Sequence, residues 1–333
     1  MPSRVRPVVA RERFDPGNTA QMPEPSPPPA PSDALQVIAL FGPTGVGKTA
    51  IAVALAELLR ERGEDPVAVS ADALQVYVGI EALTGVASQA EREALEHRMI
   101  SFLPLDATFS VGRYAQLAHG EIDALLADGR RPIVVGGTGL YLRAALADLD
   151  LRPAPVPGAR ERWTAYLQEH GAQELHAELE RRAPWAAEGL DPSNSRRVIR
   201  ALESLEAGAL EPPEGPSQLW SSELRHPTLL AGLTMERDAL YARIDARVEE
   251  IVAAGAREEV RRASAAGVSG TARKALGFEE LLNDDIELMK QRTRNYARRQ
   301  LAWMRKLSGV TAIDVTGREA DDVAAEILDS AAG

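Results

Sequence analysis

The chain contains an eight-residue segment whose residue types could hold a phosphate group. Residues 42–49 read GPTGVGKT and match the pattern G-x-x-x-x-G-K-[ST]. In this pattern the glycines let backbone N–H groups close around phosphate oxygens, the lysine adds a positive charge, and the final hydroxyl can ligate Mg²⁺. We therefore expect a diphosphate or a polyphosphate to bind to Gly42, Pro43, Thr44, Gly45, Val46, Gly47, Lys48 and Thr49, with Thr49 as the magnesium ligand.

The elements on either side of this segment are those that the pattern requires. Four apolar residues, 37–40, precede it and predict a buried strand, and residues 51–59 follow with apolar side chains at helical spacing. The positive end of that helix dipole would add to the attraction for phosphate. A glycine turn without a ligand is the plainer alternative, but the match in both spacing and context disfavours it.

Three more polar residues follow predicted strands. Asp72 comes after residues 67–70, Thr138 after residues 133–135, and Arg237 after a later apolar run. Ligands of parallel α/β sheets gather at the carboxyl ends of the strands, so we expect these side chains to face the phosphate loop. Each has a plainer alternative: Asp72 and Thr138 could cap helices, and Arg237 could pair with a carboxylate.

Several absences narrow the chemistry. Gly136 follows the strand 133–135, at a position where nucleotide hydrolases usually place a magnesium-binding acid, so a plain ATPase is disfavoured. The chain has no cysteine, which excludes disulfides, a thiolate nucleophile and a cysteine-based zinc site. No apolar run approaches the roughly 20 residues of a membrane span, and we expect a cytoplasmic protein that does not contact membranes.

Positive charge is concentrated in two segments of an acidic chain. The net charge is −11 over 333 residues, which is not typical of a nucleic-acid-binding protein, although a local basic surface can still recruit RNA. Arg196, Arg197 and Arg200 lie within about one helical turn, and residues 290–306 carry seven basic residues and no acid. The second segment also has an aromatic stripe and suits contact with RNA phosphates. Solvated faces, or arginines paired with carboxylates of the protein, are the alternatives.

Together these elements predict an α/β fold, a P-loop NTPase-like parallel sheet flanked by helices, with a mostly helical insertion. Residues 1–34 are proline-rich, and we expect a disordered tail. Residues 35–150 would form the first part of the core and residues 151–217 a helical insertion that contacts RNA. Residues 218–333 would return to the core and end with the basic helix.

Seven segments resemble those of tRNA dimethylallyltransferases, in the same order. They read GPTGVGKT, SADALQVYVG, GGTGLYLRAAL, RRVIRALE, LTMERDALYARI, RKALGFEE and RTRNYARRQLAWMR, and the resemblance runs from about residue 37 to residue 317. A phosphate loop alone occurs in many unrelated proteins, whereas seven ordered segments are specific. The resemblance implies transfer of a dimethylallyl group from dimethylallyl diphosphate to the exocyclic amine of the adenosine immediately 3′ of the tRNA anticodon.

The resemblance also implies roles for individual residues. Asp72 would be the general base, Thr44 and Lys48 would hold the diphosphate with the loop amides, and Arg237 would be a second cation on the leaving group. Mg²⁺ would bind Thr49, and the partners would be dimethylallyl diphosphate and the tRNA anticodon stem-loop, bound by a monomer. The residues implied to contact tRNA are Asp72, Ala73, Leu74, Gln75, Thr138, Arg160, Arg196, Arg197, Arg200, Lys274, Arg294 and Arg298.

The chain departs from the family pattern at Val78, Val86, Ser101 and Arg113, where basic or acidic residues are usual. Three other functions share part of the pattern. A P-loop small-molecule kinase would not need the basic helix, and an adenylate dimethylallyltransferase that makes free cytokinin would be shorter in the tRNA-gripping regions. A non-catalytic RNA-binding protein would not need Asp72.

Overall fold

The computed structural model describes residues 37–151, 156–212 and 218–332. The predicted proline-rich tail lies outside these ranges, as do residues 152–155 and 213–217 of the predicted insertion. Among the helices that are described, none combines the length and the apolar character needed to cross a membrane.

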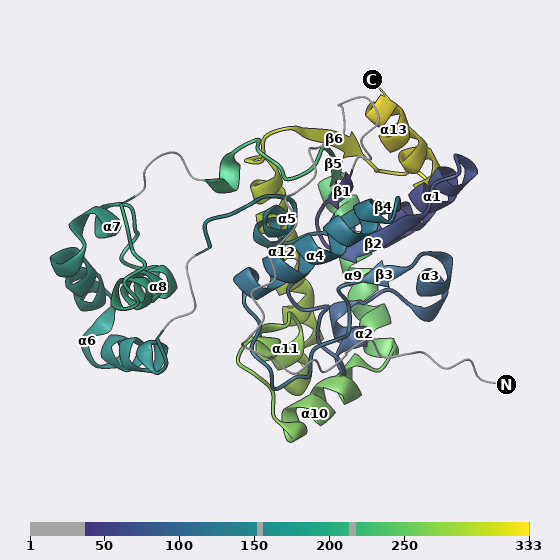
Figure 1. Ribbon diagram of the computed structural model, residues 1–333. Helices are drawn as coiled ribbons and strands as arrows, with labels where there is room; N and C mark the ends of the chain where they lie inside the picture. The colour runs from purple at the N-terminus through teal and green to yellow at the C-terminus, as the bar shows by residue number, and fades with distance from the viewer. Residues whose placement is uncertain (1–36, 152–155, 213–217, 333) are drawn as a thin grey trace, which may run out of the picture. The chain divides into compact units, whose positions relative to one another are not determined.

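Parallel strands form one sheet, which Figure 1 shows with its flanking helices. The six strands of the described ranges are ordered β3-β2-β4-β1-β5-β6, and Ile38 of β1 lies opposite Ile133 of β4 and Leu229 of β5. The predicted α/β fold with a parallel sheet is therefore confirmed. The strands are β1 (Val37–Phe41), β2 (Pro66–Ser70), β3 (His97–Arg98), β4 (Arg131–Gly136), β5 (Thr228–Thr234) and β6 (Val310–Asp314).

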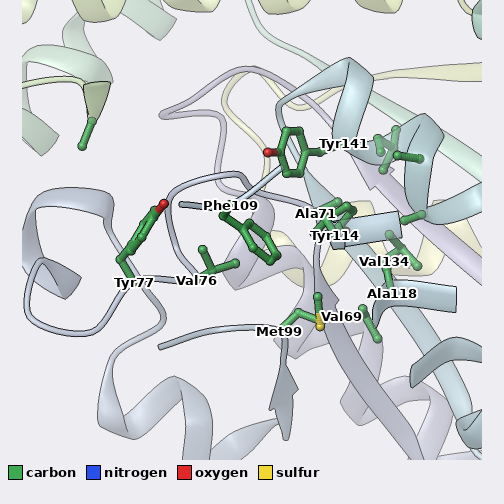
Figure 2. Close-up of a cluster of buried hydrophobic side chains, with 14 of the residues drawn as sticks. Val69, Ala71, Val76, Tyr77, Met99, Phe109, Tyr114, Ala118, Val134 and Tyr141 are labelled. Carbon is green, nitrogen blue, oxygen red and sulfur yellow. The ribbon is translucent and has the colours of Figure 1, made fainter. Parts of the chain in front are cut away.

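Both faces of the sheet are covered by apolar side chains. Val37 and Ala39 of β1 belong to one buried cluster, while Ile38 and Leu40 belong to the other. Figure 2 shows part of the first cluster, where Val69 of β2 lies among aromatic and aliphatic side chains. Burial on both faces explains why these strands are continuous apolar runs and do not alternate with polar residues.

Helices supply the other half of each cluster. Helix α1 (Lys48–Glu61) packs against α13 (Ala320–Ala332), and both contribute to the second cluster. Helix α4 (Val111–Ala127) packs against α5 (Gly139–Leu146), and both contribute to the first. The other helices around the sheet are α2 (Glu81–Thr84), α3 (Gln89–Ala94), η1 (Gln218–Trp220), α9 (Arg237–Ala253), α10 (Ala256–Ala266), η2 (Ala272–Lys274), α11 (Phe278–Leu282) and α12 (Ile286–Met304).

The predicted insertion is helical and has an apolar cluster of its own. Gly171, with φ of 84°, interrupts its first helix, so this helix consists of two helical segments joined by a kink. Trp163, Leu175 and Leu202 are buried in the cluster, which is drawn from residues 163–210. The insertion helices are α6 (Ala159–Arg182), α7 (Pro184–Glu188) and α8 (Ser195–Glu206).

Candidate active site

A cavity of about 550 Å³ lies at the carboxyl ends of three neighbouring strands. Its wall contains Thr44 after β1, Asp72 after β2 and Thr138 after β4, so residues far apart in the sequence meet there. This is the arrangement expected of a parallel α/β sheet. Helices α9 and α12 and the segment between them complete the wall with Arg243, Arg247, Lys274, Tyr296 and Gln300.

The phosphate loop, residues 42–49, borders this cavity. Gly45 and Gly47 have φ of 83° and 100°, in the left-handed region that favours glycine. A Cβ atom on Gly47 would lie 3.1 Å from a guanidinium nitrogen of Arg243, so the glycine also makes room for that cation. Val46 is buried in the core. The loop residues that line the cavity are Thr44, Gly45, Gly47, Lys48 and Thr49, whereas Gly42 and Pro43 bond to Lys48 through their carbonyls.

Lys48 is enclosed by protein but accessible from the cavity. Its Nζ donates to the carbonyls of Gly42 at 3.0 Å and Pro43 at 2.9 Å. Burial and, to a smaller extent, the positive charge of Arg247 lower the pKa of Lys48 from 10.5 to about 8, and the charge of Asp72 opposes part of this shift. An anion bound here would favour the protonated amine.

Asp72 lies at the cavity in a turn, and not at the start of a helix. Its Oδ1 accepts the N–H of Leu74 at 2.9 Å, which is an Asx turn, and the next helix begins only at Glu81. The helix-cap alternative for Asp72 therefore does not describe this structure. Ala73, Leu74 and Gln75 line the cavity beside it.

Five residues of α12 line the cavity, although no sequence pattern assigned them to it, and two of these, Tyr296 and Gln300, form hydrogen bonds to turns of the sheet. The hydroxyl of Tyr296 lies 2.8 Å from the Thr138 Oγ1, and Thr138 makes no side-chain cap to α5. Burial, together with the charge of Asp72, raises the pKa of Tyr296 to about 12, so its hydroxyl is protonated at neutral pH. The Oε1 of Gln300 accepts the N–H of Thr44 at 2.8 Å. Gln300 lies four residues after Tyr296, and this helical spacing is the sequence signal that could have found it.

The structure places Arg237 away from the cavity wall. Arg237 begins α9, its side chain is 73% exposed, and its Nε donates to Asp238 at 3.0 Å. This matches the alternative of a carboxylate partner and corrects the expected position at the leaving group. Further along the same helix, Arg243 and Arg247 line the cavity. Each directly precedes a buried apolar residue of α9, and that relation to the inward stripe could have identified them.

Acidic residues of another helix neutralise part of the basic segment of α12. Arg294 donates to Asp245 of α9 at 2.7 Å, and Lys290 lies 2.5 Å from Glu249 of the same helix. Both of these acids lie on α9, outside the basic segment, so a segment without acids in sequence is not a free cationic surface. Arg298 is exposed, donates to the nearby Asn295, and pairs with no carboxylate of the described residues.

The insertion likewise divides its cations between structural and exposed positions. Arg160 donates to both carboxylate oxygens of Glu203, at 2.6 and 2.8 Å, and Arg200 lies 3.5 Å from the same group. Glu203 is fully buried, and a buried carboxylate needs such partners. Arg196 and Arg197 are exposed, which leaves them accessible to a ligand.

The oxygen donors of the cavity fit a magnesium ion shared with a phosphate ligand. The Thr49 hydroxyl and the Asp72 carboxylate both line the wall. No cluster of three or more acidic, histidine or cysteine side chains suited to a metal occurs within the described ranges. Mg²⁺ typically takes one or two protein oxygens and completes its shell with phosphate oxygens and water. Thr49 would hold such an ion, and Asp72 could accept hydrogen bonds from its waters.

Comparison with known proteins gives consistent matches over most of the chain. Residues 75–307 match the family model described as IPP transferase. A tRNA dimethylallyltransferase from Kineococcus radiotolerans is 39% identical over 282 residues, which cover 81% of this chain and 88% of the relative. The protein of the same name from Bacillus subtilis is 36% identical over 291 residues, which cover 84% and 91%.

Solved structures agree with these matches. The full-length tRNA isopentenylpyrophosphate transferase from Bacillus halodurans superposes with a TM-score of 0.64 at 33% identity, covering 90% of this chain and 96% of that one. A eukaryotic dimethylallyltransferase acting on tRNA gives a TM-score of 0.66 at 25% identity, covering 85% and 74%.

The lowered pKa of Lys48 predicts that affinity for inorganic diphosphate falls as the pH rises. In the folded protein without ligand, the pKa of Lys48 is about 8 instead of 10.5. The positive charge of Lys48 is therefore present at pH 7 and mostly lost at pH 9. Titration calorimetry should show affinity falling by up to about tenfold per pH unit above 8. Lys48→Met should bind more weakly and lack this loss, which controls for titration of the diphosphate itself. Parallel pH profiles for the two proteins would contradict the prediction.

Proposed function

The chain belongs to the IPP transferase family, and we propose that its cavity is where a dimethylallyl group passes from dimethylallyl diphosphate to tRNA. Its activity is that of a tRNA prenyltransferase. The acceptor that we propose is the exocyclic amine of the adenosine immediately 3′ of the anticodon. The observation that carries this assignment is the meeting of the phosphate loop and Asp72 in one cavity.

The donor half of the reaction uses the cationic side of the cavity. As the bond between the dimethylallyl carbon and the diphosphate oxygen breaks, its electron pair stays on the diphosphate. The loop residues, Lys48, Arg243 and Arg247 line the cavity and would stabilise that charge. The two arginines take the role that the sequence had suggested for Arg237. A magnesium ion held by Thr49 would add further charge neutralisation when bound.

The acceptor half uses the carboxylate. The adenine amine is a poor nucleophile, and it forms the new carbon–nitrogen bond as it gives up a proton. Asp72 would take that proton on its free carboxylate oxygen, since Oδ1 already accepts the Leu74 N–H. The fixed turn orients the carboxylate before the substrate arrives, so little reorganisation is needed at the moment of reaction.

The target base must leave the stack of the anticodon loop to enter the cavity. Enzymes that act on bases commonly meet this cost of a few kcal/mol through contacts to the surrounding nucleic acid. Thr138 and Lys274 line the cavity, while Arg196, Arg197 and Arg298 are exposed cations outside it. We assign the first two to the base and its neighbours and the others to the phosphate backbone.

The alternatives are not favoured. A small-molecule kinase and a free-cytokinin enzyme would share the phosphate loop, but the relatives that match most of this chain carry tRNA-modifying names. We propose that the protein acts as a monomer. We also propose that it acts in the cytoplasm, because its substrate would be tRNA.

Asp72→Asn should lower turnover by roughly 100-fold or more, the usual scale for loss of a general base. Asparagine keeps an oxygen for the Leu74 N–H but does not accept the proton. The assay combines labelled dimethylallyl diphosphate, Mg²⁺ and unmodified tRNA, followed by nucleoside analysis, with tRNA affinity as the control. Turnover close to that of the unchanged protein would remove Asp72 from the mechanism.

Alanine variants along α9 should separate cavity arginines from an exposed one. Arg243→Ala and Arg247→Ala should each reduce kcat/KM for dimethylallyl diphosphate by roughly 100-fold, as expected for loss of a charge-stabilising donor. Arg237→Ala is the matched control on the same helix and should stay within about twofold of the unchanged protein, since Arg237 points to Asp238. The opposite ranking would return Arg237 to the site. Consumption of ATP with dimethylallyl diphosphate untouched would favour the kinase.

A similar pair of alanine variants on α12 tests which cations bind tRNA. Arg298→Ala should flatten the log–log salt dependence of tRNA affinity by about one unit, because one phosphate contact is lost. Arg294→Ala should leave that slope unchanged and lower the free energy of unfolding by up to about 1 kcal/mol, because it leaves Asp245 unpaired. Filter binding at several salt concentrations, beside urea denaturation, measures both effects. Equal slopes for Arg298→Ala and the unchanged protein would count against the α12 surface.

A further inference from the structure

A buried hydrogen bond connects the phosphate loop to the helix that we assign to tRNA. Gln300 of α12 is only 5% exposed, and its Oε1 accepts the backbone N–H of Thr44 at 2.8 Å. A buried amide side chain without partners would cost stability, so this bond fixes both groups. The N–H of Thr44 is one of the amides that a phosphate loop offers to its ligand, and here it is already committed to α12.

The surroundings of Gln300 hold its side chain in one place. A Cβ atom on Gly137 would lie 2.3 Å from the Gln300 Nε2 and 3.0 Å from the carbonyl oxygen of Gly42, so only glycine at 137 admits the amide. Tyr296, one turn earlier on α12, has its hydroxyl 2.8 Å from the Thr138 Oγ1. The amide thus lies between the turns that follow β1 and β4, the two neighbouring strands at the cavity.

We propose that Gln300 is a positioning residue of the transfer reaction, which holds the Thr44 peptide so that the Thr44 hydroxyl and the later loop amides meet the diphosphate. The inference rests on the proposed role of the loop in binding dimethylallyl diphosphate. With its N–H turned to α12, Thr44 contributes its side chain to the cavity, where it is part of the wall. The amides left for the ligand are those of Gly45, Gly47, Lys48 and Thr49, which also line it.

The same bond makes the donor site depend on α12. Any shift of this helix when tRNA binds is transmitted to the Thr44 peptide through a short, buried contact. Gln300 therefore acts on the diphosphate through Thr44 and does not itself touch the reacting atoms. Its loss should affect the donor and spare tRNA affinity.

The test uses the full chain and a double-mutant cycle. Gln300→Met keeps the length of the side chain but removes the amide, and Thr44→Val removes the hydroxyl while keeping the backbone N–H. Gln291→Met is the matched control, because Gln291 lies on the exposed side of α12. Steady-state prenylation gives kcat and KM for each substrate, calorimetry with inorganic diphosphate gives affinity, and melting curves report folding.

Gln300→Met should lower kcat/KM for dimethylallyl diphosphate by roughly 10- to 100-fold, as misplacement of a positioned group does, and leave KM for tRNA within about twofold. The double variant Thr44→Val/Gln300→Met should be little worse than the more impaired single variant, because Gln300→Met already displaces the hydroxyl that Thr44→Val removes. Gln291→Met should match the unchanged protein. Additive losses, an equal loss of tRNA affinity, or an unchanged kcat/KM for Gln300→Met would each overturn the proposal.

Failure of the underlying function gives a different result. If the unchanged protein does not prenylate tRNA, the proposed function fails at that step. Calorimetry still tests the loop, because Gln300→Met should weaken binding of inorganic diphosphate by about tenfold or more if Gln300 positions it. Equal affinity for the two proteins would then overturn the role of Gln300 independently.

Discussion

The shared direction of the strands determines where the chemistry of this protein takes place. Because all six described strands are parallel, the segments that leave their carboxyl ends emerge at one edge of the sheet. β1 lies between β4 and β5, and β4 also pairs with β2, so Thr44, Asp72 and Thr138 become neighbours without being close in sequence. The apolar clusters on both faces hold the strands rigid, and the polar site needs only short turns to be placed accurately.

The cavity carries positive charge before any ligand binds. Lys48, Arg243 and Arg247 line one cavity together with Asp72, whose charge opposes the shift in the lysine pKa. Cations held together in a partly enclosed space repel one another, and an incoming diphosphate relieves that repulsion. The net charge of the whole chain is −11, and this acidic balance repels polyanions that do not fit the basic regions.

Sequence patterns predicted the parts of the site that local spacing controls. The phosphate loop and Asp72 follow directly from a strand, a turn and a chemical pattern, and the structure places both at the cavity. Partners that come from elsewhere in the chain could not be predicted this way. Arg294 looked free because the acid that neutralises it, Asp245, lies on another helix. Gln300 is an ordinary residue until the fold brings it against Thr44.

The order of the strands along the chain affects how the protein folds during synthesis. Of the described strands, β1 leaves the ribosome first, yet its register with β5 joins Val37 to Thr228, so one edge of this apolar strand stays unpaired until most of the chain exists. The helical residues 159–206 are synthesised during that wait and can bury their own cluster. Long-range parallel pairing is slow and exposes strand edges to other chains. An inner strand of the finished enzyme, β1, therefore has an unpaired edge that is open to aggregation during much of synthesis.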